Sequence, residues 1–171
     1  MSGTTNTIDV LLLVDADNLI STRDVEGSVS LVVQHSLVDP NATNNEQDGG
    51  SELWFDVKRG DIVRWRATSL SRNFDTTALI SDIVLGDNSS GHYGGVLSTP
   101  DYLTFPDVPV AYLQGTNPLK GGSTATTVTL WQATAESPGK LFYKIQFYLL
   151  DQETNIVGGP YIWDPYITIN N

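Results

Sequence analysis

Residues 60–74 constrain the fold of this chain more than any other stretch. Gly60 and Asp61 are typical of a turn, and residues 62–68, rich in β-branched and aromatic side chains, predict a strand. Alternation along that strand places three apolar side chains on one face: Val63, Trp65 and Ala67. The opposite face carries Arg64 and Arg66. The first face must be buried, so the stretch predicts a sheet with Trp65 in its core and the two arginines outside it.

The same two-residue period recurs in short segments that are separated by polar loops. The strand patterns cover residues 8–14, 28–35, 52–57, 79–85, 123–136, 140–150 and 161–169. The clearest alternation is in 140–150, where one face is wholly apolar: Leu141, Tyr143, Ile145, Phe147 and Leu149. Three prolines between residues 96 and 114 predict an edge strand or an irregular crossover, because proline cannot donate to a ladder.

No segment holds a helical period for three turns, so we expect at most one or two short helices. About eight short strands with polar loops predict an all-β fold, a single-domain antiparallel β-sandwich of the jelly-roll or immunoglobulin-like kind over residues 1–171. The length suits one domain with a substantial core, and we find neither an internal repeat nor a linker.

The composition limits which partners the protein can bind and in which cellular compartment we expect it. The formal net charge of −11 disfavours nucleic acid and anionic membrane surfaces. The chain has no cysteine, hence no disulfide and no thiolate chemistry. Its N-terminus lacks the pattern of a signal peptide, and no apolar run reaches the length of a membrane span. We therefore expect a cytoplasmic protein without membrane insertion, although release by a route without a signal peptide stays open.

Three motifs together resemble the AidA/PixA inclusion-body protein family. They are IDVLLLVD at 8–15 followed by Asp17-Asn18, GDIVRWRATSLSRNFD at 60–75, and YIWDPYI at 161–167. The resemblance implies a small bacterial protein that is stored in intracellular inclusions or expressed under quorum-sensing control. The family offers no established catalytic residue that could be transferred to this chain.

The residues themselves also argue against an enzyme. Only two histidines exist, His35 and His92, and neither lies near a nucleophile elbow. The spacings HxH and HExxH are absent, so a histidine metal site is not expected. We predict no catalytic residues and no cofactor.

Two acidic turns could offer oxygen ligands to calcium. One contains Asp15, Asp17 and Asn18, and the other contains Asp82, Asp87 and Asn88. The spacing of an EF-hand is absent from both, and such turns are more often Asx-turns. We therefore predict no metal site, with Asp15, Asp17 and Asn18 as the ligands if one exists.

Two further groups are candidates for ligand binding. Arg64 and Arg66 project from the same strand face and could hold a carboxylate or phosphate, or could pair with acids on neighbouring strands. Trp163 beside Asp164 lies in a strand broken by proline, which makes its ring the aromatic most expected to be exposed for stacking on a sugar.

These observations favour a non-enzymatic protein that acts by self-assembly or binding. The alternatives are a carbohydrate-binding, lectin-like module and, third, an enzyme of unknown type. The face of residues 140–150 opposite the core carries Phe142, Tyr148 and Leu150, and an exposed apolar patch of this kind predicts a homodimer with a two-fold axis. Burial of that face under the other sheet is the alternative.

Overall fold

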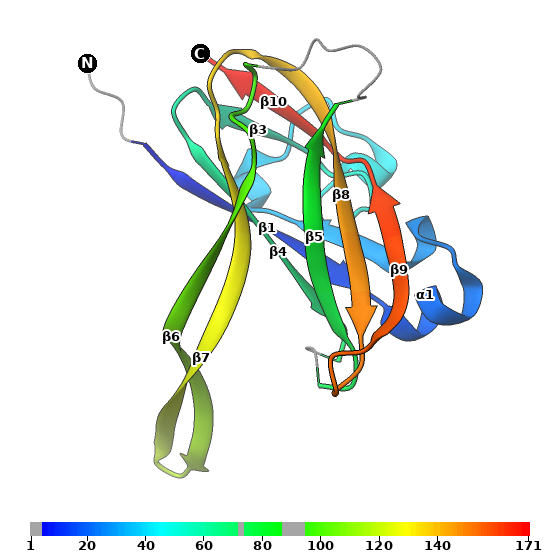
Figure 1. Cartoon of the computed structure of the whole chain (residues 1–171). Helices are drawn as coiled ribbons and strands as arrows, with labels where there is room; N and C mark the ends of the chain where they lie inside the picture. Colours follow the sequence, from blue (N-terminus) through cyan, green and yellow to red (C-terminus); the bar gives the residue numbers. More distant parts are fainter. Residues whose placement is uncertain (1–4, 72–73, 87–94) are drawn as a thin grey trace.

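The computed structural model describes residues 5–71, 74–86 and 95–171, and its strands form two facing sheets (Figure 1). The first sheet has the order β2-β1-β4-β7-β6. Its strands are β1 (Thr7–Val14), β2 (Val29–Val32), β4 (Ile62–Ser69), β6 (Asp101–Thr116) and β7 (Leu119–Thr134). The second sheet has the order β3-β10-β8-β5, and β9 also pairs with β8. Its strands are β3 (Trp54–Lys58), β5 (Thr77–Leu85), β8 (Gly139–Leu150), β9 (Ile156–Trp163) and β10 (Tyr166–Asn170). The predicted β-sandwich is confirmed.

Both sheets are mixed, which corrects the purely antiparallel arrangement expected from the sequence. β1 runs parallel to β4, and β3 runs parallel to β10. In each pair the partners are far apart in the chain, with several other elements between them. Short hairpin connections can make only antiparallel neighbours. The parallel pairs therefore come from long crossovers, whose direction a local hydrophobic pattern does not encode.

The core lies between the sheets and is built by the alternation that the sequence predicts. On β8 every second residue from Leu141 to Leu149 is buried. Trp65 of β4 is fully buried, and its indole N–H donates to the hydroxyl of Tyr143, 3.1 Å away on the opposite sheet. The two ring centroids are 5.4 Å apart. The predicted burial of Trp65 is confirmed.

The helical content is small, as expected. One α-helix, α1 (Ala16–Thr22), follows β1 and ends at Arg23, which has φ 60°. Three short 3₁₀ turns complete the helical content of the described residues: η1 (Glu26–Ser28), η2 (His35–Leu37) and η3 (Asn44–Glu46). No helix in the described ranges is long and apolar enough to cross a membrane.

The most prominent feature outside the sandwich is a long hairpin of β6 and β7, which we call the arm. Figure 1 shows it as a twisted two-stranded ribbon that extends away from the two sheets. β7 pairs with β4 only over Trp131–Thr134, close to the body. The register of the β6–β7 pair shifts between Phe105 and Val108, which accommodates Pro106. β6 forms the edge of its sheet, as the prolines predicted, whereas the length of the arm was not anticipated.

Candidate functional site

The two arginines of β4 pair with a carboxylate of the neighbouring strand. Arg64 donates through Nε to Asp9 Oδ1 at 3.0 Å and through Nη2 to Asp9 Oδ2 at 2.8 Å. Arg66 Nη2 lies 3.7 Å from Asp9 Oδ1. Asp9 stands directly opposite Arg64 in the parallel β1–β4 register. Of the two interpretations left open by the sequence, the structure contains the cross-strand pair, which occupies the guanidinium group of Arg64.

Trp163 is not the most exposed aromatic ring, contrary to expectation. Its ring is half-buried against the core, and its indole N–H donates to the carbonyl of Ser51 at 2.7 Å. Asp164 is exposed at the break between β9 and β10, but the following Pro165 is buried. The proline therefore turns the chain back into the sandwich. Larger exposed fractions occur at Phe74, Tyr102 and Tyr112.

The first acidic turn caps α1. Asp15 Oδ1 accepts the backbone N–H of Asn18 at 3.0 Å, and the Asn18 side chain donates to Ser28 Oγ at 2.8 Å. Asp17 is exposed in the first turn of the helix. These contacts give Asp15 and Asn18 a structural role, because an Asp at the N-cap satisfies an unpaired backbone donor. Among the residues that the structure describes, no group of three or more His, Cys, Asp or Glu could hold a metal.

The remaining sequence candidates do not converge on a site. Asp82 is half-buried on β5, whereas Asp87, Asn88 and His92 lie outside the described residues. His35 is exposed in η2, with its Nδ1 3.8 Å from Asp48 Oδ2.

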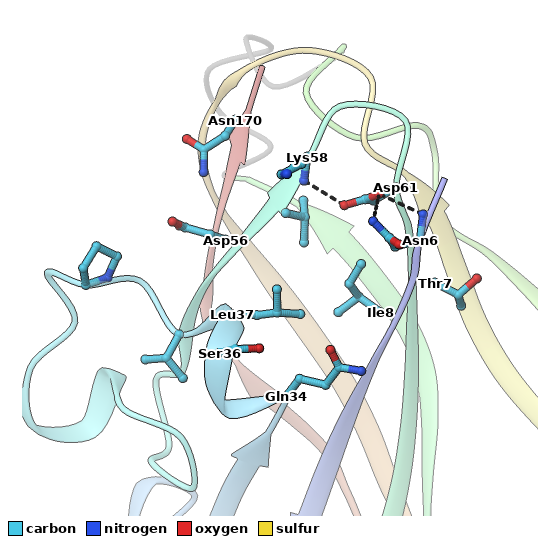
Figure 2. Close-up of a pocket in the computed structure, with 13 residues that line it drawn as sticks. Asn6, Thr7, Ile8, Gln34, Ser36, Leu37, Asp56, Lys58, Asp61 and Asn170 are labelled. Carbon is cyan, nitrogen blue, oxygen red and sulfur yellow. Dashed lines mark hydrogen bonds between the residues drawn. The ribbon is translucent and has the colours of Figure 1, made fainter. Parts of the chain in front are cut away.

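A pocket that the sequence did not indicate opens at the end of the sandwich where β1 and β3 lie beside the η2 turn. It has a volume of about 730 Å³, within the range of small-molecule sites. Figure 2 shows Asp56, Lys58 and Asn170 lining it from the second sheet, and Gln34, Ser36 and Leu37 from the segment around η2. Leu37 and Val38 supply half-buried apolar surface, whereas the apolar lining residues Ile8 and Val57 are only 3% and 2% exposed. The pocket thus combines an apolar wall with several hydrogen-bonding side chains.

One wall of the pocket is fixed by a buried carboxylate in the turn between β3 and β4. Asp61 accepts the backbone N–H of Asn6 at 3.0 Å and that of Lys58 at 2.9 Å. Figure 2 marks these contacts, together with a third from the Asn6 side chain. Gly60 has φ +92°, a conformation that favours glycine. The Gly60-Asp61 turn therefore ties the start of β1 to the end of β3.

Asp56 is the electrostatically unusual group of the pocket. Burial, a hydrogen bond with the Asp39 carboxyl and the charge of Asp39 raise the pKa of Asp56 from 3.8 to about 6, while a hydrogen bond from Asn170 lowers it. Asp39 is buried, and its Oδ1 accepts two hydrogen bonds from Asn41. Asp56 Oδ1 is buried and has no hydrogen-bond partner among the described residues. Asp56 therefore carries one enclosed oxygen without a donor at the wall of the pocket.

The outer face of the second sheet is only partly covered. Phe142, Tyr148 and Leu150 are half-buried there. The first sheet packs on the opposite face of β8, where the core residues lie, and so does not cover them. Leu79 and Ile162, on the strands beside β8, are 45% and 50% exposed. The alternative in which the other sheet covers this face is therefore wrong, and an apolar surface stays accessible.

The arm is an exposed surface with few charges. Residues 102–131 contain one acid, Asp107, and one base, Lys120, in a chain with 29 formally charged Lys, Arg, Asp and Glu side chains (9 + 20). Five large apolar side chains on it are exposed: Tyr102, Phe105, Tyr112, Leu113 and Leu119. The outer edge of β7 over residues 119–130 has no strand partner in the described part of the chain.

Two of the comparisons with known proteins point to the same family. The family model "PixA: Inclusion body protein" matches residues 6–169. The crystal structure of an inclusion body protein (PixA) from Burkholderia cenocepacia has a similar fold, with a TM-score of 0.72 and 17% identity over 99% of each chain. A solution structure of Amebosin, with a TM-score of 0.25 and 10% identity over 68% of this chain and 88% of that chain, supports no structural argument. No curated protein matches the sequence significantly.

Proposed function

Because the chain belongs to the PixA inclusion body protein family, we propose that it has a non-enzymatic role and acts by assembling with copies of itself through the arm. The observation that supports this proposal is a two-stranded ribbon outside the sandwich that has few charges and five exposed large apolar side chains. Such a ribbon is marginally stable alone in water. Contact with a second copy would cover it.

The free edge of β7 is the best pairing surface of the arm. An unpaired edge offers a row of N–H and C=O groups to another strand, and proteins usually block it with charges, prolines or bulges. β6 carries Pro106 and Pro109, whereas residues 119–130 of β7 contain no proline and a single charge, Lys120. Antiparallel pairing of β7 with the β7 of a second copy would give a symmetric four-stranded ribbon, the arrangement typical of a two-fold dimer.

Growth into a large assembly needs a second surface, because a two-fold contact closes on itself. The outer face of the second sheet can supply it, with Leu79, Tyr148 and Ile162 as its apolar centre. This is the face for which the sequence predicted self-association through Phe142, Tyr148 and Leu150. The two surfaces lie on different sheets, so both can be occupied at once.

A pair of lysine variants tests the role of the arm by sedimentation velocity. Leu113 and Leu119 are 61% and 80% exposed on the arm, while Leu70 and Ile156 are 61% and 64% exposed elsewhere. We expect the parent to sediment as a species larger than the 18.6 kDa monomer. Leu113→Lys with Leu119→Lys should shift it toward the monomer, and the matched control, Leu70→Lys with Ile156→Lys, should not.

A parent that is monomeric at high micromolar concentration contradicts the proposal, and so does an equal shift in both double variants. A glycan array of the same samples addresses the alternative, a carbohydrate-binding module. Specific glycan binding by a monomeric parent would favour that module, with the exposed rings of Tyr102 and Tyr112 as the stacking surfaces to test first.

A further inference from the structure

The pocket beside η2 presents two side chains of opposite charge that do not pair with each other. Asp56 and Lys58 both line it and lie on the same face of β3, two residues apart, which separates their Cα atoms by roughly 6.6 Å. In the described part of the chain no ion pair joins them, and the ammonium group of Lys58 has no carboxylate within salt-bridge distance. A carboxylate that can bind a cation and an ammonium group that can bind an anion thus lie on the same face of the strand.

Asp56 is the more buried of the two charged residues. Asp56 Oδ1 is buried and accepts no hydrogen bond from the described residues. A buried acceptor without a donor costs free energy, so groups of this kind are usually satisfied by a partner. Asp39 and Asn170 already interact with the Asp56 side chain. Because Oδ1 is enclosed, a ligand in the pocket can contact Asp56 only through the part of its side chain that lines the pocket.

Part of the pocket wall is apolar. Leu37 and Val38 are half-buried and line it from the segment around η2, whereas Ile8 and Val57 are only 3% and 2% exposed. A ligand with methylene groups between its charges would bury them against this wall, which is favourable. An anion alone would lie near two carboxyl groups, and a cation alone would leave Lys58 unused.

We propose that this pocket binds a small linear zwitterion. The primary ammonium group of the ligand donates to Asp56, its carboxylate accepts from Lys58, and its methylene chain lies against Leu37. 5-Aminopentanoate, whose nitrogen and carboxyl carbon lie roughly 6 Å apart by standard bond lengths when the chain is extended, is a simple probe of this class. This inference goes beyond self-assembly and does not depend on it.

Calorimetric titration with three probes of equal carbon number tests the inference. 5-Aminopentanoate carries both charges, pentanoate lacks the ammonium group, and pentylamine lacks the carboxylate. We expect saturable binding of 5-aminopentanoate and binding of the other two at least about tenfold weaker, because each loses one charge-assisted hydrogen bond. No binding of 5-aminopentanoate, or equal binding of all three, overturns the inference.

Variants of Asp56 and Lys58 test which charged end of the ligand each residue binds. Asp56→Asn should weaken 5-aminopentanoate at least about tenfold and leave pentanoate unchanged, and Lys58→Gln should weaken it similarly and leave pentylamine unchanged. Asp17→Asn and Lys120→Gln are the controls, because both residues are exposed and neither lines the pocket. The Leu113→Lys, Leu119→Lys variant should bind 5-aminopentanoate like the parent. Unchanged binding in Asp56→Asn and Lys58→Gln, with a native near-ultraviolet spectrum, would place the ligand elsewhere and sink the proposal.

Discussion

The indole N–H of Trp65 and the hydroxyl of Tyr143 form a 3.1 Å hydrogen bond that joins the two sheets inside the core. Both side chains are fully buried. Burial raises the pKa of the Tyr143 hydroxyl, and the hydrogen bond from Trp65 lowers it. Buried polar groups are stable only when they are paired, so the two rings specify the alignment of the two sheets as well as filling the core.

Removing either ring of this pair should destabilise the protein measurably. We expect Trp65→Ala to lower the free energy of unfolding by about 3–5 kcal/mol, the usual cost of deleting a large core aromatic. Tyr143→Phe keeps the ring but leaves the Trp65 donor without a partner, which costs about 1–3 kcal/mol. Urea denaturation measures both. The control is Tyr112→Phe, since Tyr112 is exposed on the arm; a loss below about 1 kcal/mol in Trp65→Ala would contradict the assignment of faces.

The burial of Trp65 could be predicted from the sequence because alternation is a local property. The same holds for β8, whose buried residues follow the period of two without exception. The sequence could indicate that Arg64 pairs with an acid on a neighbouring strand, but not that this acid is Asp9. The two residues are 55 positions apart and meet only through a parallel register. No pattern within either strand specifies its neighbour.

The arm and the pocket were missed for different physical reasons. Pro106 and Pro109 predicted an edge strand or an irregular crossover, and an edge strand with a register shift tolerates them. The run from 102 to 131, which has only two charged residues and Asn117-Pro118 at its turn, was the signal that could have revealed one long hairpin. The pocket depends on tertiary contacts such as Asp39 with Asp56, which a single sequence does not reveal.

The Gly60-Asp61 turn should be sensitive to loss of its carboxylate. Asp61→Ala leaves the backbone N–H groups of Asn6 and Lys58 without their acceptor in a buried site. Each unsatisfied donor costs about 1–3 kcal/mol, so we expect a loss of about 2–4 kcal/mol in urea denaturation. Asp61→Asn retains one acceptor oxygen and should lose less. Equal losses in the two variants would show that hydrogen bonding does not explain the effect.

The role of Asp15 as the N-cap of α1 predicts that the stability of the protein does not depend on metal. Asp15→Ala should cost about 1 kcal/mol, because it removes the acceptor for Asn18 N–H at the N-cap of α1. Asp15→Asn should cost less, since Asn is an equally good cap. The melting temperature of the parent should be the same in calcium and in a chelator, because structural metal sites contribute folding energy directly. A calcium-dependent increase that Asp15→Asn abolishes would make Asp15 a ligand.

Salt should distinguish the proposed assembly from association by charge pairing. At a net charge of −11 the copies repel each other, and salt screens that repulsion. Since the arm between residues 102 and 131 carries only Asp107 and Lys120, we expect the sedimenting species to grow as the ionic strength rises. Dissociation by salt would instead indicate ion pairs as the main contacts and would contradict assembly through the arm.

The Asp56 carboxyl should make stability depend on pH in a direction opposite to that of a salt-bridged acid. Its pKa is raised from 3.8 to about 6 by burial and by Asp39, which faces it together with Asn170; Lys58 and Asp61 line the same pocket. The folded state therefore holds the proton more tightly than the unfolded state. The contribution is fully present below the unfolded pKa of 3.8 and is lost as the pH rises to the folded pKa of about 6. Because the group is only partly buried, we expect a loss of about 1–2 kcal/mol.

In Asp56→Asn this component should disappear, and the variant should be more stable than the parent at neutral pH. Urea denaturation across this pH range measures the difference, and an identical pH profile in parent and variant would show that Asp56 does not carry the shift.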